Sequence, residues 1–211
     1  MSIVTLPTGI LFGVYQIAQQ RYDLMEMSET SGAMATRLVA PPRWKLSIAS
    51  PNPGLSQEQA ALWKKLLLQL RGGINYLAAY DVVQQAPRGT MRGTLTLTAI
   101  AAAGATSISF SGGSGEAGKT ILTGDLLQIG TGVGSHYCVA TSDGTANGSG
   151  VITGLSIEPP TRVSFAIGTS IVWDKPVAYY KMTSGSNVWS YVPGTVNLMT
   201  GFGTEFLESF T

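Results

Sequence analysis

The chain carries little charge for its length. Asp, Glu, Lys and Arg make up 12% of the 211 residues, and 13 basic against 12 acidic side chains leave a formal net charge of +1. Average soluble proteins contain roughly 25% charged residues, and a freely diffusing monomer usually needs a larger net charge to stay soluble. The composition therefore favours a protein that covers much of its surface with partners.

The sequence also lacks a basic face. Nucleic acid is bound through clustered Lys and Arg side chains, whereas the 13 basic residues of this chain are scattered. Lys64, Lys65 and Arg71 lie close together, but they fall on the polar side of a predicted helix, where solvated charges are expected. We therefore expect no nucleic-acid partner.

Cysteine and histidine are nearly absent. Cys138 and His136 are the single residues of their types. An intrachain disulfide is thus excluded, and the two residues alone cannot complete a four-ligand zinc site. We expect Cys138 to be a buried free thiol, in a protein that folds in a reducing cytoplasm.

Long apolar runs are missing as well. No window contains about 20 uninterrupted apolar residues, the length that a membrane-spanning helix needs. Near the start of the chain, Pro7, Gly9 and Gly13 interrupt the apolar residues and no basic region precedes them. We expect neither a membrane span nor a secretory signal.

One segment has a helical pattern. Ser56 and Gln59 have the spacing of a capping box, and Gly72-Gly73 is typical of the end of a helix. Between them, apolar residues recur at helical spacing: Leu62, Trp63, Leu66, Leu67 and Leu70. The sequence predicts a helix over 56–71, whose apolar stripe must pack on a sheet or a partner.

The rest of the chain is predicted to be β-structure. In the first section, residues 1–91, strands are expected at 33–38 and 44–47, on either side of a break at Pro41-Pro42. In the section 92–174, short alternating segments with frequent Gly turns predict a small barrel or sandwich. Its strands are expected at 94–97, 106–110, 125–129, 135–141, 150–157 and 169–173.

The last section, residues 175–211, is too short to fold alone. Strands are expected there at 178–182, 188–192 and 196–199, and they would complete the sheet that 1–91 begins. The predicted fold is mainly β with one α-helix. It has a β-sandwich or split-barrel core, residues 1–91 plus 175–211, and an inserted small β-barrel module, residues 92–174.

One segment matches the phosphate-loop pattern in sequence but lacks the secondary structure that such a loop needs. The segment from Gly113 to Thr120, GSGEAGKT, fits the pattern G-x-x-x-x-G-K-[ST]. A phosphate loop needs a strand before it and a helix directly after it. A strand is expected at 106–110, but Gly124 interrupts the following segment and residues 125–129 alternate like a strand. We interpret the match as a Gly-rich loop without nucleotide chemistry.

A second candidate combines His136, Cys138 and Asp143. Residues two apart on a strand share a face, so the imidazole and the thiol could approach each other as base and nucleophile. Nothing in the sequence places an orienting residue beside them. A strand cysteine that packs as a small apolar residue is far commoner.

The remaining candidates are acidic and aromatic. Five acidic residues could be paired for acid–base work or calcium, but none has calcium-loop spacing; they are Asp23, Glu26, Glu29, Glu205 and Glu208. Four tryptophans could line a sugar site, although core packing is commoner in β-rich domains; they are Trp44, Trp63, Trp173 and Trp189. We assign no catalytic, cofactor-binding or metal-binding residue, and we expect no cofactor and no enzymatic activity.

The order of several short motifs resembles a segment of tailed-bacteriophage structural proteins. A Gly-Asp pair opens a strand, a Tyr-containing strand and an Asp-Gly turn follow, and then come Pro-Pro-x-Arg and a strand that ends before Pro. In this chain they are Gly124-Asp125, Tyr137, Asp143-Gly144, Pro159-Pro160-Thr161-Arg162 and the segment 172–176. With the flanks at 70–81 and 205–210, most of the chain is similar to phage distal tail proteins, although residues 145–150 lengthen the Asp143 turn.

The resemblance implies a structural role. Proteins of this family form a homo-oligomeric ring, a hexamer, that joins the tail tube to the tail tip or baseplate hub. The expected partners are further copies of the chain, the tail tube protein and a hub or baseplate protein, and the expected location is the virion tail after assembly in the host cytoplasm. The alternative is a carbohydrate- or receptor-binding β module of the tail tip.

Overall fold

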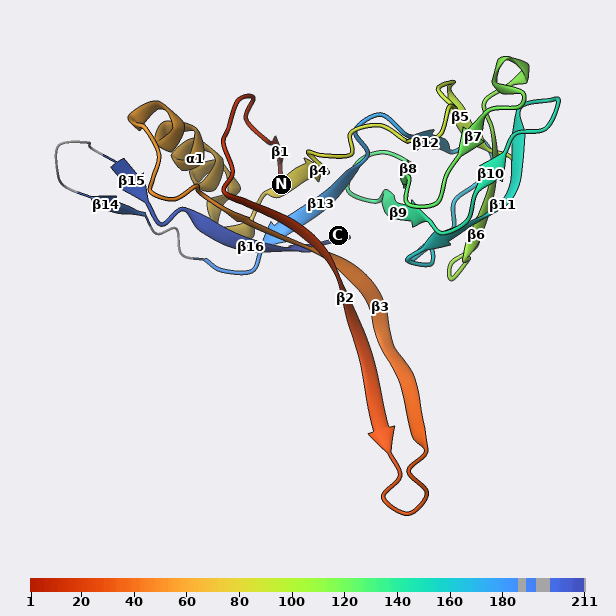
Figure 1. Ribbon diagram of the computed structural model, residues 1–211, viewed down its shortest axis with the longest axis horizontal. Helices are drawn as coiled ribbons and strands as arrows, with labels where there is room; N and C mark the ends of the chain where they lie inside the picture. Colours follow the sequence, from red (N-terminus) through yellow and green to blue (C-terminus); the bar gives the residue numbers. More distant parts are fainter. Residues whose placement is uncertain (186–188, 193–197, 211) are drawn as a thin grey trace. The chain divides into compact units, whose positions relative to one another are not determined.

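The computed structural model describes residues 1–185, 189–192 and 198–210 (Figure 1). Its contacts divide the chain into two compact units. The first unit comprises residues 1–19, 44–80 and 177–211, and the second comprises residues 20–43 and 81–176. The long strands β2 (Val14–Met27) and β3 (Met34–Ala49) belong in part to each.

A mixed six-stranded sheet forms the centre of the first unit. Its strand order is β1-β4-β13-β16-β3-β2, where β1 is Ile3–Thr5, β4 is Tyr76–Tyr80, β13 is Val177–Met182 and β16 is Gly203–Glu208. Strand β1 runs parallel to β4, whereas β13 is antiparallel to both β4 and β16. A separate antiparallel pair is formed by β14 (Ser190–Val192) and β15 (Leu198–Thr200).

The helix α1 (Gln57–Leu70) supplies the apolar layer that the sequence predicts. Its buried residues include Trp63, Leu66 and Leu70, and the Trp63 ring lies 5.9 Å from the ring of Phe202. Ser56 caps the helix by accepting a hydrogen bond from the Gln59 amide at 3.4 Å. The Gln59 side chain does not complete a capping box, because it donates to the Gly9 carbonyl and accepts from the Leu11 amide.

The second unit contains a closed β-barrel (Figure 1, green to teal). The strands follow the order β11-β6-β5-β12-β8-β9 around the barrel. Their bounds are Leu95–Leu97 for β5, Ser107–Ser111 for β6, Leu126–Ile129 for β8, His136–Ala140 for β9, Val151–Glu158 for β11 and Ser170–Val172 for β12. Closure removes the unpaired sheet edges that otherwise invite aggregation.

Short secondary-structure elements connect the longer ones in both units. The 3-10 helix η2 (Ser114–Glu116) precedes β7 (Thr120–Ile121), which pairs with β10 (Gly144–Thr145). In the first unit, the 3-10 turn η1 (Arg71–Gly73) follows α1. The barrel core is apolar, with Phe110, Leu127 and Ile129 fully buried.

The structure confirms the predicted fold class, mainly β with one helix and a small closed barrel. It corrects the break expected at Pro41-Pro42, because residues 34–49 form one continuous strand. Strand β16 pairs with β3 only over residues 45–49, so the prolines occupy an edge position on that side, where a missing N–H is tolerated. Of the strands expected in the last section, residues 188 and 196–197 lie outside the described residues.

Candidate functional site

The segment that matches a phosphate loop does not adopt the geometry of one. Strand β7 begins at its last residue, Thr120, where a phosphate loop would continue into a helix; the sequence likewise predicts no helix there. Its amides are already bonded within the fold: Gly118 N donates to Ala146 O at 3.0 Å, Lys119 N to Glu116 O at 3.1 Å and Thr120 N to Thr90 Oγ1 at 3.1 Å. These amides cannot wrap a phosphate while they make these bonds.

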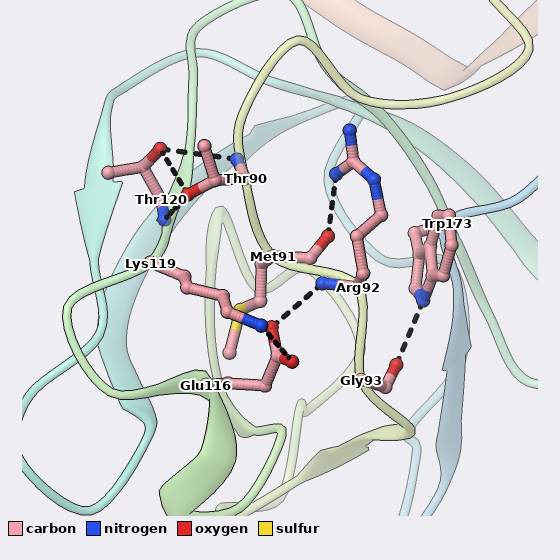
Figure 2. Close-up of polar contacts among 8 residues, drawn as sticks. All are labelled: Thr90, Met91, Arg92, Gly93, Glu116, Lys119, Thr120 and Trp173. Atoms are coloured by element: carbon pink, nitrogen blue, oxygen red, sulfur yellow. Dashed lines mark hydrogen bonds and ion pairs between the residues drawn. The ribbon is translucent and has the colours of Figure 1, made fainter.

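The lysine of the motif is bound by the motif's own glutamate (Figure 2). Lys119 Nζ lies 2.7 Å from Glu116 Oε1, and the Arg92 amide donates to Glu116 Oε2 at 2.7 Å. The Glu116 side chain is 8% exposed. The Lys119 ammonium and the Arg92 amide hold the pKa of Glu116 below its ordinary value, so the carboxylate is charged and acts as a structural acceptor.

Arg92 and Trp173 lie together where the chain enters and leaves the barrel (Figure 2). The Arg92 guanidinium stands 5.2 Å from the Trp173 ring centroid, in a cation–π arrangement. Trp173 Nε1 donates to Gly93 O at 2.9 Å. We call the set drawn in Figure 2 the barrel neck; it comprises Thr90, Met91, Arg92, Gly93, Glu116, Lys119, Thr120 and Trp173. Its polar groups bind one another, which fits a structural role in holding the two ends of the barrel segment together.

Asp125 is a second buried acceptor beside the barrel neck. Its carboxylate accepts from the amides of Arg88 at 2.7 Å, Gly89 at 3.0 Å and Leu122 at 2.8 Å, and the residue is fully buried. It therefore fixes residues 88–89, which lead into the barrel, against the turn before β8. The sequence reasoning assigned no role to Glu116 or Asp125; an acidic residue inside a Gly-rich turn is the signal for both, because such turns leave free amides.

The structure does not bring His136, Cys138 and Asp143 together as a catalytic set. His136 is 1% exposed and its Nε2 lies 2.9 Å from the Pro159 carbonyl oxygen. Burial, with a smaller contribution from the Arg162 charge, lowers the pKa of His136 to about 4. Cys138 packs in the barrel core. Asp143 accepts from the amide and hydroxyl of Thr123 at 2.7 and 2.9 Å, which lowers the pKa of Asp143.

The acidic candidates have separate surroundings. Glu205 pairs with Lys45 at 2.9 Å, Asp23 pairs with Arg21 at 2.7 Å, and buried Glu208 accepts from the Trp44 amide. The two remaining acids, Glu26 and Glu29, are exposed. Across the part of the chain that the structure describes, no group of three or more His, Cys, Asp or Glu side chains is placed to hold a metal ion.

The tryptophans do not form a common platform. Trp63 is fully buried and donates from Nε1 to Leu11 O at 3.0 Å. Trp189 stacks on Phe202, which also neighbours Trp63, with 6.1 Å between the ring centroids of Trp189 and Phe202. The Lys64 ammonium lies 5.3 Å from the centroid of the Trp189 ring. Trp173 belongs to the barrel neck of the other unit. Their uses in the structure are packing and local hydrogen bonds.

The hairpin of β2 and β3 (Figure 1, red-orange to orange) exposes several large apolar side chains. Every residue from 24 to 39 is exposed; we call this segment the ribbon. Its large apolar side chains are 49–67% exposed, and they are Leu24, Met25, Met27, Met34, Leu38 and Val39. The sequence predicts a strand at 33–38 within this segment, but no local pattern shows that the described residues leave it uncovered.

A polar cleft of about 550 Å³ lies in the first unit. Its lining consists of residues 2–8 together with Lys65, Gln69, Arg71 and Asn75. Asn75 fixes two of its walls, since Oδ1 accepts from the Ser2 amide at 3.0 Å and Nδ2 donates to the Gln69 carbonyl at 2.8 Å. The lining contains two cations and no carboxylate side chain; we call it the basic cleft.

Comparison with known proteins identifies no relative of the chain. No family model matches the sequence, and no curated protein matches it either. Among the described residues, no helix is both long enough and apolar enough to cross a membrane.

Proposed function

We propose that the protein is a structural component of a phage tail, a distal tail protein. Its copies associate into a ring, a hexamer, that joins the tail tube to the tail tip or baseplate hub. Two independent supports are the order of motifs in the sequence and the exposed ribbon. The ribbon carries the proposal, because it is a feature of this chain that a neighbouring copy would cover.

The ribbon is poorly suited to stand alone in water. A two-stranded hairpin is marginally stable by itself and gains stability from a third strand or a covering layer. Here the residues on both of its faces are exposed. Its six large apolar side chains, half or more exposed in most cases, are spread over both faces, and exposed apolar surface of this kind marks an interaction surface.

The strand edges of the hairpin also favour contact with a neighbouring copy. In the six-stranded sheet β2 is an edge strand, and β3 pairs with β16 only through residues 45–49. The exposed part of β3, residues 34–39, lies beyond that pairing and at 3.3 Å per residue extends roughly 20 Å. An exposed strand edge of this kind invites pairing with another chain. Contact between different surfaces of identical copies closes into a ring when the rotation per copy allows it.

The low charge and the barrel are consistent with such an assembly. A net charge of +1 on 211 residues gives little self-repulsion between copies. The barrel neck satisfies its own polar groups, which stabilises the barrel where the chain enters and leaves it. In this proposal the barrel serves as an attachment surface for neighbouring tail proteins.

The role of the ribbon in self-association can be tested by replacing its apolar side chains. Met25→Thr, Met27→Thr and Met34→Thr together should keep the fold and shift the protein from oligomer to monomer in light-scattering measurements. The matched control replaces three exposed apolar residues of the barrel unit, Ile100, Val163 and Ile167, by Thr and should leave the oligomer intact. An unchanged oligomer of the ribbon variant would contradict the role of the ribbon.

A further inference from the structure

The basic cleft contains two cations, Lys65 and Arg71, that form no ion pair within the described residues. Ion pairs among the described residues include Arg21–Asp23, Arg21–Glu158, Lys45–Glu205 and Lys119–Glu116. Neither Lys65 nor Arg71 takes part in them, and both residues are exposed. A concave polar site that gathers two like charges without a counter-charge fits a partner that supplies the negative charge.

The walls of this cleft are fixed rather than adaptable. Asn75 is buried and bridges the start of the chain to the last turn of α1 through its two amide hydrogen bonds. Arg71 itself sits in the left-handed region with φ 51°, as the C-cap whose amide donates to the Leu68 carbonyl. A binding surface whose backbone is already fixed loses less entropy when it binds a partner.

The same chain carries the complementary charge on the ribbon. Glu26 lies near the end of β2 and Glu29 in the turn that follows, where both are exposed, and neither forms an ion pair within the described part of the chain. The turn itself is ordered by backbone bonds, since Ser28 N donates to Ala33 O at 2.9 Å and Gly32 N to Ser28 O at 2.8 Å. Two acids on a defined turn match two cations in a defined cleft.

We propose that the acidic turn of the ribbon in one copy, Glu26 and Glu29, docks in the basic cleft of a second copy, at Lys65 and Arg71. This inference rests on the proposed self-association and names the surfaces that it uses. The two surfaces differ, so the contact is head-to-tail and each copy uses both its turn and its cleft. The turn is exposed along its whole length, so a second copy has access to it.

Charge reversal tests the contact directly. The cleft variant carries Lys65→Glu and Arg71→Glu, and the turn variant carries Glu26→Lys and Glu29→Lys. Each variant alone places like charges face to face and should weaken self-association at least 10-fold in sedimentation experiments at 50 mM salt. Mixed in equal amounts, the two variants present complementary surfaces again and should associate as alternating copies with near wild-type affinity.

The controls separate this inference from the proposed function. Lys64→Glu changes the charge of the same helix outside the cleft lining and should leave association unchanged; an equal loss in this variant would overturn the inference. A wild-type oligomer that both reversal variants preserve, or that their mixture fails to restore, would overturn the docking contact and leave the ring proposal standing. A wild-type chain that remains monomeric would overturn both.

Discussion

The ammonium group of Lys119 lies 2.7 Å from the carboxylate of Glu116, three residues before it in the same Gly-rich loop. In a phosphate loop the lysine must reach a nucleotide phosphate. Here its charge is neutralised locally, and the same carboxylate also holds the Arg92 amide at 2.7 Å. The loop therefore acts as part of the barrel neck.

We expect no nucleotide binding at this loop. Titration with magnesium-ATP should give no heat above dilution for the wild-type protein or for Lys119→Ala. The same substitution should lower the melting temperature, because Glu116 loses the ammonium group that neutralises it. Measurable ATP binding that disappears in Lys119→Ala would contradict this interpretation.

Asp125 should be among the residues on which the stability of the barrel depends most. Asp125→Ala leaves three amides, those of Arg88, Gly89 and Leu122, without their acceptor. Each buried donor left unsatisfied costs about 1 to 3 kcal/mol where water cannot reach it. The free energy of unfolding, measured in urea, should therefore fall by about 3 kcal/mol or more. Asp143→Ala is the control, since its contacts to Thr123 are exposed and its effect should be clearly smaller.

Stability should fall in mild acid because of His136. Its pKa is lowered from 6.5 to about 4 in the fold, so the unfolded chain binds more protons between these values. The free energy of unfolding should therefore decrease as the pH falls from 6.5 towards 4, by about 3 kcal/mol in total. Urea midpoints at pH 7, 5 and 4 measure the decrease.

His136→Gln supplies the control for this pH dependence. It removes the titrating group, so the part of the decrease between pH 6.5 and 4.5 should disappear. Glu116 and Asp143 also have lowered pKa values, but their ordinary values of 4.5 and 3.8 confine their contribution to more acidic solutions. An identical pH profile for wild type and His136→Gln would refute the role of the buried imidazole.

Gly150 should not tolerate a side chain. Its φ is 75°, and a Cβ atom there would lie 1.7 Å from the Gly113 carbonyl oxygen. Gly150→Ala should destabilise the protein by about 2 kcal/mol or more through backbone strain and displacement of the loop. Gly148→Ala, two residues away with nothing within 4 Å of its Cβ, should change stability by less than about 0.5 kcal/mol. Equal melting temperatures for the two variants would contradict this packing.

The local parts of the fold were predictable from the sequence. Ser56 and the apolar spacing up to Leu70 predict α1 because capping and helical periodicity are short-range signals. The frequent Gly turns likewise predict the short strands that form the barrel. Pro41-Pro42 was misleading, since a proline ends a strand only where its missing N–H is needed for pairing, and strand neighbours are a long-range property.

The candidate surfaces were less predictable. Glu116 and Arg92 are separated by 24 residues in sequence, so their hydrogen bond depends on barrel closure. The exposure of the ribbon follows from the absence of a covering layer within the described chain, which no local pattern encodes. The sequence did indicate that His136 and Cys138 share a strand, but their burial in the barrel depends on its closure.

The most direct test of the account is the mass of the wild-type protein in solution. Native mass spectrometry and negative-stain images at low salt should show a closed ring of identical copies, a hexamer of the 22.1 kDa chain. The same preparation of the Met25→Thr, Met27→Thr, Met34→Thr variant should contain monomers. A wild-type protein that stays monomeric at every concentration and salt condition would contradict the proposed function.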